Sequence, residues 1–275
     1  MSDSKQPKLE IQISSPQALV RRMDQQLELV ERLLAEADAA HALVPINFTN
    51  SLGMTMIWCP PGEFLMGSPE SEEGRNQNEN QVLVRISKGF WMASTPVTQG
   101  QWQALMHSNP SRFQASKALP VEEVDWDDAK AFCNKLNSVE KPPSGYIYSL
   151  PSEAQWEYSC RAGTHSVYSG RSLDELGWYE RNSGGHTHEV GRKNANAWGI
   201  HDMHGNVWEW CADWWETHLS GGSDPMGAVS ESMRVVRGAS WRDGEHDCRS
   251  AYRIWGVAGF LQRSIGFRVA AIPVR

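Results

Sequence analysis

Two acidic residues, Asp202 and Glu209, enclose a turn in a tryptophan-rich stretch, residues 196–215. The backbone carbonyls of Gly205 and Val207 lie between them in the chain and could converge with both carboxylates on one hard cation. Because calcium takes oxygen ligands in proteins, these four residues predict a structural calcium site. The spacing differs from the regular calcium-binding loop of about twelve residues, so capping of the turn by the carboxylates is the alternative.

The same stretch holds five of the 13 tryptophans of the chain, and indole rings at this density need to be packed. Asp202, Gly205 and Asn206 interrupt the stretch with residue types that tolerate tight or left-handed backbone. This pattern predicts a loop wrapped around its own indole rings, rather than a strand or a helix.

Cysteine and histidine are the other residue types that could carry chemistry. The five cysteines are an odd number without paired short spacings, which argues against a disulfide framework or a zinc ribbon. His186, His188, His201 and His204 lie in one Gly- and Asn-rich region, but no triad of carboxylate and histidine is convincingly spaced there. We therefore favour turn or surface histidines over a transition-metal site.

Composition narrows the classes of protein to consider. The 275 residues are 40% hydrophobic, enough for one large domain with a sizeable core or at most two small ones. A net charge of -7 without clustered Lys and Arg argues against a nucleic-acid or anionic-membrane surface. The chain has neither an apolar stretch of membrane-spanning length nor the hydrophobic core of a signal peptide, so we expect a cytoplasmic protein.

An amphipathic helix is predicted for residues 15–41, after an extended or disordered tail, 1–14, and before a linker, 42–51. Ser15 is a natural N-cap and Pro16 suits the first helical position. The apolar positions follow the spacing of a coiled-coil seam for barely more than two heptads, too short for an independent coiled coil. The helix therefore needs to dock, either on its own domain or on a partner chain through oligomerisation or a larger assembly.

The domain itself is predicted to begin at residue 52. Residues 54–68 read as a hairpin, 69–80 as a solvated acidic loop and 81–94 as strand. Three short helices begin at capping residues and carry a tryptophan inward each: Thr98 before Trp102, Asp125 before Trp126, and Ser152 before Trp156.

Five phrases of the sequence together resemble the formylglycine-generating enzyme family, also called sulfatase-modifying-factor domains. They occur in the order of that family: TPVTQGQWQALM at 95–106, LPSEAQWEYSCRAG at 150–163, GIHDMHGNVWEW at 199–210, RGASW at 237–241 and IGFRVA at 265–270. The resemblance implies one α+β domain over 52–275 with a C-type-lectin-like core, short helices, a small antiparallel sheet, many loops, and calcium sites that stiffen them.

The resemblance also implies where catalysis would reside. Catalytic members carry two redox cysteines, two and seven residues past the aromatic residue of a GGSW-like turn, which bind copper(I) and use oxygen to convert a substrate cysteine to formylglycine. Counting from Trp241 gives Asp243 and Cys248, so the first cysteine is replaced. A carboxylate suits copper(I) poorly and would raise the pKa of the neighbouring thiol. We expect no redox metal and a buried, structural Cys248, which would be the catalytic residue if the chain were an enzyme.

Two loops near the C-terminus, residues 242–247 and 254–264, are instead unusually apolar for that family. An exposed cluster of large apolar residues with a rim of Arg, His and Gln is typical of a binding surface, although the cluster could also fold under and complete the core. The residues predicted to contact a protein or other ligand are Arg242, Asp243, Gly244, His246, Asp247, Ile254, Trp255, Val257, Phe260, Leu261, Gln262 and Arg263.

The chain further resembles variable proteins of diversity-generating retroelements, which combine this fold with a C-terminal region templated by an Asn-rich repeat that is mutated at adenines. Most residues of the two loops are reachable from an Asn codon in that way, whereas Glu245 and Gln262 are not, and Trp255 requires an Arg codon. Three functions remain open: a non-catalytic recognition domain, a metal-dependent oxidase acting on a peptide or small thiol, and an accessory module with neither activity.

Overall fold

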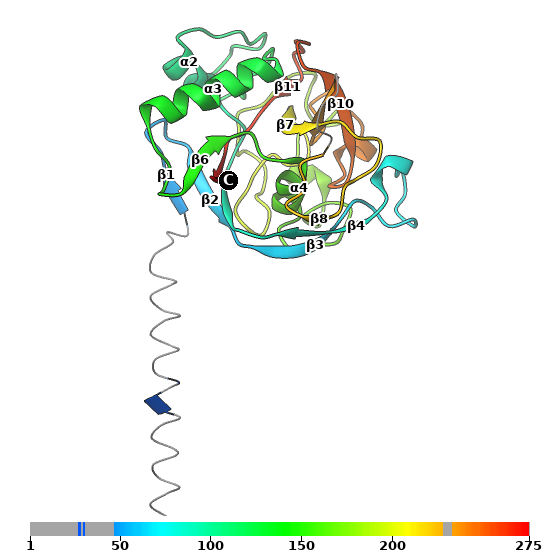
Figure 1. Cartoon of the computed structure of the whole chain (residues 1–275). Helices are drawn as coiled ribbons and strands as arrows, with labels where there is room; N and C mark the ends of the chain where they lie inside the picture. The colour runs from blue at the N-terminus through cyan, green and yellow to red at the C-terminus, as the bar shows by residue number, and fades with distance from the viewer. Residues whose placement is uncertain (1–26, 29, 31–46, 228–232, 275) are drawn as a thin grey trace, which may run out of the picture. The chain divides into compact units, whose positions relative to one another are not determined.

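The computed structural model describes residues 27–28, 30, 47–227 and 233–274 (Figure 1). The chain divides into two compact units, Met1–Pro45 and Ile46–Arg275. In the first unit, Leu27, Glu28 and Val30 are helical. The rest of the predicted helix 15–41, the tail 1–14 and the first part of the linker 42–51 lie outside the described residues. No helix in the described part is long and apolar enough to cross a membrane.

The second unit is built on three small sheets in its described part. Most strand pairs are antiparallel, and the two parallel pairs are β7 with β11 and β4 with β8. The first sheet has the strand order β1 (Asn47–Thr49), β2 (Thr55–Cys59), β5 (Phe90–Ala93), β12 (Ala270–Pro273), β6 (Tyr146–Ser149). The second has the order β10 (Arg253–Val257), β9 (Met233–Arg237), β7 (Trp208–Trp214), β11 (Ile265–Gly266). The third has the order β3 (Gly62–Met66), β4 (Val82–Ile86), β8 (Gly222–Ser223).

The three predicted helices form where their capping residues indicate. Thr98, Asp125 and Ser152 each complete a reciprocal capping box, and the helices that follow are α2 (Gln99–Met106), α3 (Trp126–Val139) and α4 (Glu153–Arg161). The shorter elements are α5 (Leu173–Leu176), η1 (Gln77–Glu79) and η2 (Glu245–Cys248). α4 lies in the middle of the domain, where it contacts β3, β7 and β9 (Figure 1).

Four local predictions were wrong, and one of them has a local cause. Residues 54–68 do not form a hairpin, because β2 and β3 belong to different sheets. Pro60 and Pro61 separate these strands, and their fixed negative φ excludes the positive-φ turns that close two-residue hairpins. Residues 47–49, expected at the end of the linker, are strand β1 and pair with β2.

The other two errors concern burial. Residues 208–214, predicted as part of a loop, form the strand β7, which has β9 and β11 on its two edges. Because this strand is almost continuously buried, its sequence lacks the alternation of polar and apolar residues that would have indicated a strand. Residues 69–80 are not a solvated loop throughout, since Glu72 and Glu79 are buried and both bond to Nη1 of Arg249 at 2.7 Å.

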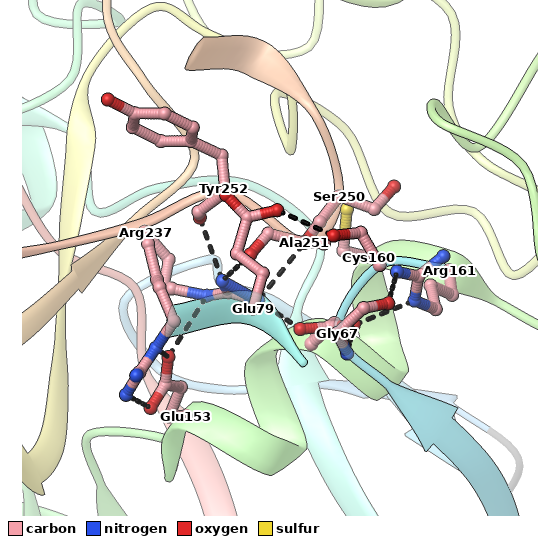
Figure 2. Close-up of polar contacts among 12 residues, drawn as sticks. Gly67, Glu79, Glu153, Cys160, Arg161, Arg237, Ser250, Ala251 and Tyr252 are labelled. Atoms are coloured by element: carbon pink, nitrogen blue, oxygen red, sulfur yellow. Dashed lines mark hydrogen bonds and ion pairs between the residues drawn. The ribbon is translucent and has the colours of Figure 1, made fainter. Parts of the chain in front are cut away.

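Buried arginines join the C-terminal part of the domain to earlier elements. Arg237 of β9 is paired with Glu157 of α4 and donates to the carbonyls of Ser250, Ala251 and Tyr252 (Figure 2). Glu157 also accepts from Nε of Arg161 at 2.8 Å. Because these side chains are excluded from water, their charges depend on one another for compensation.

Three further arginines make the same kind of link. Each places its guanidinium against a buried carboxylate on a segment distant in sequence: Arg249 against Glu72 and Glu79, Arg253 against both oxygens of Glu153 at 2.7 Å, and Arg268 against both oxygens of Glu209 at 2.6 and 2.7 Å. Two-point pairing of this kind fixes orientation as well as distance.

Substituting Arg237 tests how much the buried pairs stabilise the fold. Arg237→Met leaves Glu157 with one fewer buried partner and four donor bonds unmade, so we expect a loss of about 3 kcal/mol in the free energy of unfolding. Urea denaturation measures this loss. The matched control is Arg181→Met, which removes an exposed pair with Asp174 and should leave the midpoint almost unchanged. Similar midpoints for the two variants would contradict a stabilising role for the buried pair.

Candidate ligand-binding face

The apolar residues of the second C-terminal loop remain at the surface. Trp255, Val257, Phe260 and Leu261 are 49%, 52%, 54% and 55% exposed, respectively, while Ile254 is half-buried. The alternative that this cluster folds under to complete the core is therefore wrong for four of its five members. We call these four residues the apolar display cluster.

The strand β10 positions the first half of the cluster. It is the outer strand of its sheet, with Trp255 opposite Val235 and Val257 opposite Met233 on β9. Between them, Gly256 packs against the indole of Trp210, where an added Cβ would lie 2.5 Å from the ring. Glycine at this position lets β10 sit close to the core and leaves its neighbours pointing outward.

The backbone after β10 is anchored although its side chains are exposed. Four of its carbonyls accept hydrogen bonds from residues of the framework. The bonds run from Trp126 N to Ala258 O (3.0 Å), Glu123 N to Gln262 O (3.1 Å), Trp241 Nε1 to Arg263 O (3.2 Å) and Trp208 N to Ser264 O (2.8 Å). The loop is thus held at both ends, while Phe260 and Leu261 lie between the anchored positions.

The first loop, residues 242–247, is fixed through Asp243. One carboxylate oxygen of Asp243 accepts from the indole of Trp208 at 2.8 Å and from the hydroxyl of Ser240, and its carbonyl accepts from Glu180 N at 3.0 Å. Burial raises the pKa of Asp243. These bonds give Asp243 a structural role, and its contact with ligand stays a prediction. Trp208 bonds to both loops, a role that sequence reasoning missed.

The other predicted contact residues differ in accessibility. Arg242, His246 and Arg263 are exposed and therefore accessible to a ligand. Gly244, Asp247 and Gln262 are half-buried, and Asp247 accepts from Gly244 N at 3.1 Å within the loop. The Arg263 guanidinium lies 5.5 Å from the centre of the Trp241 ring, which places this arginine beside the start of the first loop.

Cys248 is fully buried, as expected from the sequence. Its pKa is raised far above the ordinary value, first by burial and then by the carboxylates of Asp243, Asp247 and Glu245. Because the thiolate is the form that attacks substrates and binds soft metals, a thiol held protonated in this way is poorly suited to either task.

A family model described as the sulfatase-modifying factor enzyme 1-like domain matches residues 44–272. The chain belongs to this family. The solved structure of Treponema denticola variable protein 1 is similar at 30% identity and a TM-score of 0.76, covering 84% of this chain and all of that one. PvdO from Pseudomonas aeruginosa is similar at 28% identity and a TM-score of 0.74, covering 82% of this chain and 97% of that one.

The family includes proteins described as enzymes and proteins described otherwise. The formylglycine-generating enzyme of Mus musculus is 32% identical over 203 residues, which are 66% of this chain and 51% of the mouse protein. The chain therefore spans about half the length of that relative. Membership of this family establishes the mixed α+β fold of short helices and small sheets. It does not establish whether the chain is an enzyme, because the family includes both kinds of protein.

The four histidines singled out in the sequence each lie against a backbone carbonyl, and His204 is buried rather than at the surface. In each, Nδ1 or Nε2 lies at a backbone carbonyl: His186 at Thr187, His188 at Ser183, His201 at Lys193 and His204 at Cys248, all within 2.7–2.8 Å. Burial lowers the pKa of His204 to about 4, so that ring is neutral at pH 7. Within the described residues, no group of three or more His, Cys, Asp or Glu is arranged to hold a metal ion.

Two of the predicted calcium ligands, Asp202 and Glu209, already use part of their carboxylates in hydrogen bonds. One oxygen of Asp202 accepts from Gly191 N at 2.7 Å, while Oδ1 is buried without a hydrogen-bond partner. Glu209 Oε2 accepts from Arg268 and from the Trp156 indole, and Oε1 accepts one bond from Arg268. A carboxylate oxygen has two lone pairs, so Asp202 Oδ1 and Glu209 Oε1 each retain capacity to accept a further contact. Calcium here stays a prediction.

Calcium dependence of the melting temperature tests this site. Protein stripped with EGTA should gain about 2.7 kcal/mol when free calcium reaches 100 times its dissociation constant, which raises Tm by roughly 5 °C or more. Asp202→Asn should abolish the response, whereas Asp174→Asn, at an exposed position, should retain it. Equal melting temperatures of the wild type in EGTA and in calcium would leave turn capping as the role of Asp202.

Proposed function

We propose that this chain is a non-catalytic recognition domain that presents residues 242–247 and 254–264 to a protein ligand. The observation that carries the proposal is the apolar display cluster, four large side chains about half exposed on an anchored backbone. A soluble domain gains little from leaving aromatic and aliphatic side chains together in water, and such patches usually mark interaction sites.

The composition of the face favours a protein partner. Trp255 and Phe260 provide large apolar areas, and exposed Arg242 and Arg263, on the same two loops, provide hydrogen-bond donors. Aromatic residues and arginine are enriched in protein interfaces and carry much of their binding energy. An anchored main chain also loses less conformational entropy on binding than a flexible loop, so more of the contact energy is available as affinity.

The arrangement of framework and loops supports a narrower proposal, that the chain is a variable protein of a diversity-generating retroelement. Arg237 precedes the first loop, Arg249 and Arg253 lie between the two loops, and Arg268 follows the second. Substitutions confined to the display cluster would leave these buried ion pairs intact. Asp243 is an exception within the first loop, because its carboxylate is part of the framework. A near-copy of the 3′ coding sequence beside a reverse transcriptase gene would test this proposal.

The oxidase alternative is disfavoured by the same residues. Asp243, which stands where the catalytic members have their first redox cysteine, is engaged by Trp208 and Ser240, and Cys248 is buried and protonated. A soft metal such as copper(I) prefers paired thiolates, which this arrangement does not offer.

Substituting residues of the apolar display cluster should weaken binding without lowering the stability of the fold. We predict that Trp255→Ser combined with Phe260→Ser weakens binding to a captured partner roughly thirtyfold or more, as for loss of interface hot spots, while Tm stays within a few degrees. The partner is captured from host extract and purified, and its affinity for the wild type and for the double variant is then measured by calorimetry.

The matched control changes two equally exposed apolar residues elsewhere, Leu83→Ser and Val139→Ser, whose side chains are 58% and 62% exposed. This control should bind as the wild type does. Equal affinity of the display variant and the control would contradict the proposal. Stoichiometric copper binding with oxygen consumption in the presence of a cysteine peptide would favour the oxidase instead.

A further inference from the structure

A separate cavity of about 460 Å³ is lined, in the described part of the chain, by residues of α3, α4, β6 and β12 and their neighbours. Its apolar surface comes from Ile86, Leu150, Ile272 and the indole of Trp126. None of the four display-cluster residues lines it, so this cavity is distinct from the face described above. Its volume is within the range of small-molecule sites, roughly 300–1,000 Å³.

The charges on the cavity wall are unbalanced. Lys88 and Lys130 both line it, and among the described residues neither has a carboxylate within ion-pair distance. The Lys130 ammonium makes one long bond, 3.5 Å, to the hydroxyl of Ser149. Asp224 is the one carboxylate among the described lining residues, and it accepts from the backbone N–H and the hydroxyl of Ser87.

Hydroxyl groups add neutral donors beside these lysines. Ser152 caps α4 by accepting from Gln155 N at 3.1 Å, which leaves its hydroxyl proton available to donate. Ser149 and Ser152 are both buried at the cavity wall. Lys130 is half-buried and Lys88 is exposed. An anion beside Lys130 would therefore find ammonium and hydroxyl donors in a partly dehydrated setting, where charge-assisted hydrogen bonds are strong.

We propose that this cavity binds an organic anion, with a carboxylate directed at Lys130 and Lys88 and an apolar body against Ile86, Leu150 and Trp126. A small inorganic anion would leave the apolar wall uncovered, and a neutral apolar ligand would leave the half-buried Lys130 ammonium without a charged partner. The amphipathic anion satisfies both halves of the lining. This site does not depend on the proposed recognition function.

The probes for the test are 2-naphthoate and its neutral analogue 2-naphthamide, measured by isothermal titration calorimetry on the full chain. We expect saturable binding of one naphthoate per chain and at least tenfold weaker binding of the amide. Lys130→Met should weaken naphthoate binding about tenfold, corresponding to loss of one ion pair in a partly buried site. Lys88→Met, at an exposed lysine, should weaken it by a smaller factor. Lys135→Met, on the same helix but absent from the lining, should bind as the wild type does.

Four outcomes would overturn the proposal: no saturable naphthoate binding in the millimolar range, equal affinity for the amide, unchanged affinity in both Lys130→Met and Lys88→Met, or loss of binding in the Trp255→Ser, Phe260→Ser variant. The last result would place the probe on the apolar display cluster instead. Circular dichroism of each variant ensures that the comparison is between folded proteins.

Discussion

Buried arginine–carboxylate pairs hold the C-terminal part of this domain to the rest of it. β10 and β11 are short, and the loops beside them have little regular secondary structure to define their course. Four buried arginines fix the course of these segments, because each donates several hydrogen bonds to carboxylate or carbonyl oxygens: Arg237, Arg249, Arg253 and Arg268. Burial makes these contacts mutually dependent, because removing one partner leaves a charge without compensation in a medium that solvates it poorly.

This division between framework and surface explains how one segment can serve stability and recognition together. The arginines point into the domain, where α4, β7 and residues 69–80 provide their partners, and the display cluster points outward. Trp208 connects the two, because its backbone bonds to Ser264 and its indole to Asp243. The residue that replaces the expected first redox cysteine therefore contributes to the shape of the face.

Local signals predicted part of this structure and long-range pairs determined the rest. The capping boxes at Thr98, Asp125 and Ser152 are complete within four residues, so they are visible in the sequence. The exposure of Trp255 and Phe260 was also predicted, from their unusual place in a family loop. Residues 69–80 were misjudged because their composition is hydrophilic, whereas the Arg249 that buries Glu79 lies 170 positions away. A local sequence pattern cannot predict a pair of residues so far apart in the chain.

A preorganised binding face requires that the framework hold the loop of residues 254–264 rigidly. The amides of Glu123 and Trp126 report on it directly, because they donate to the loop carbonyls of Gln262 and Ala258. Native-state hydrogen exchange should show both amides exchanging as slowly as those of the central strand β7, by global unfolding. Fast exchange of Glu123 and Trp126 while β7 stays protected would show that the loop detaches on its own, which contradicts a preorganised binding face.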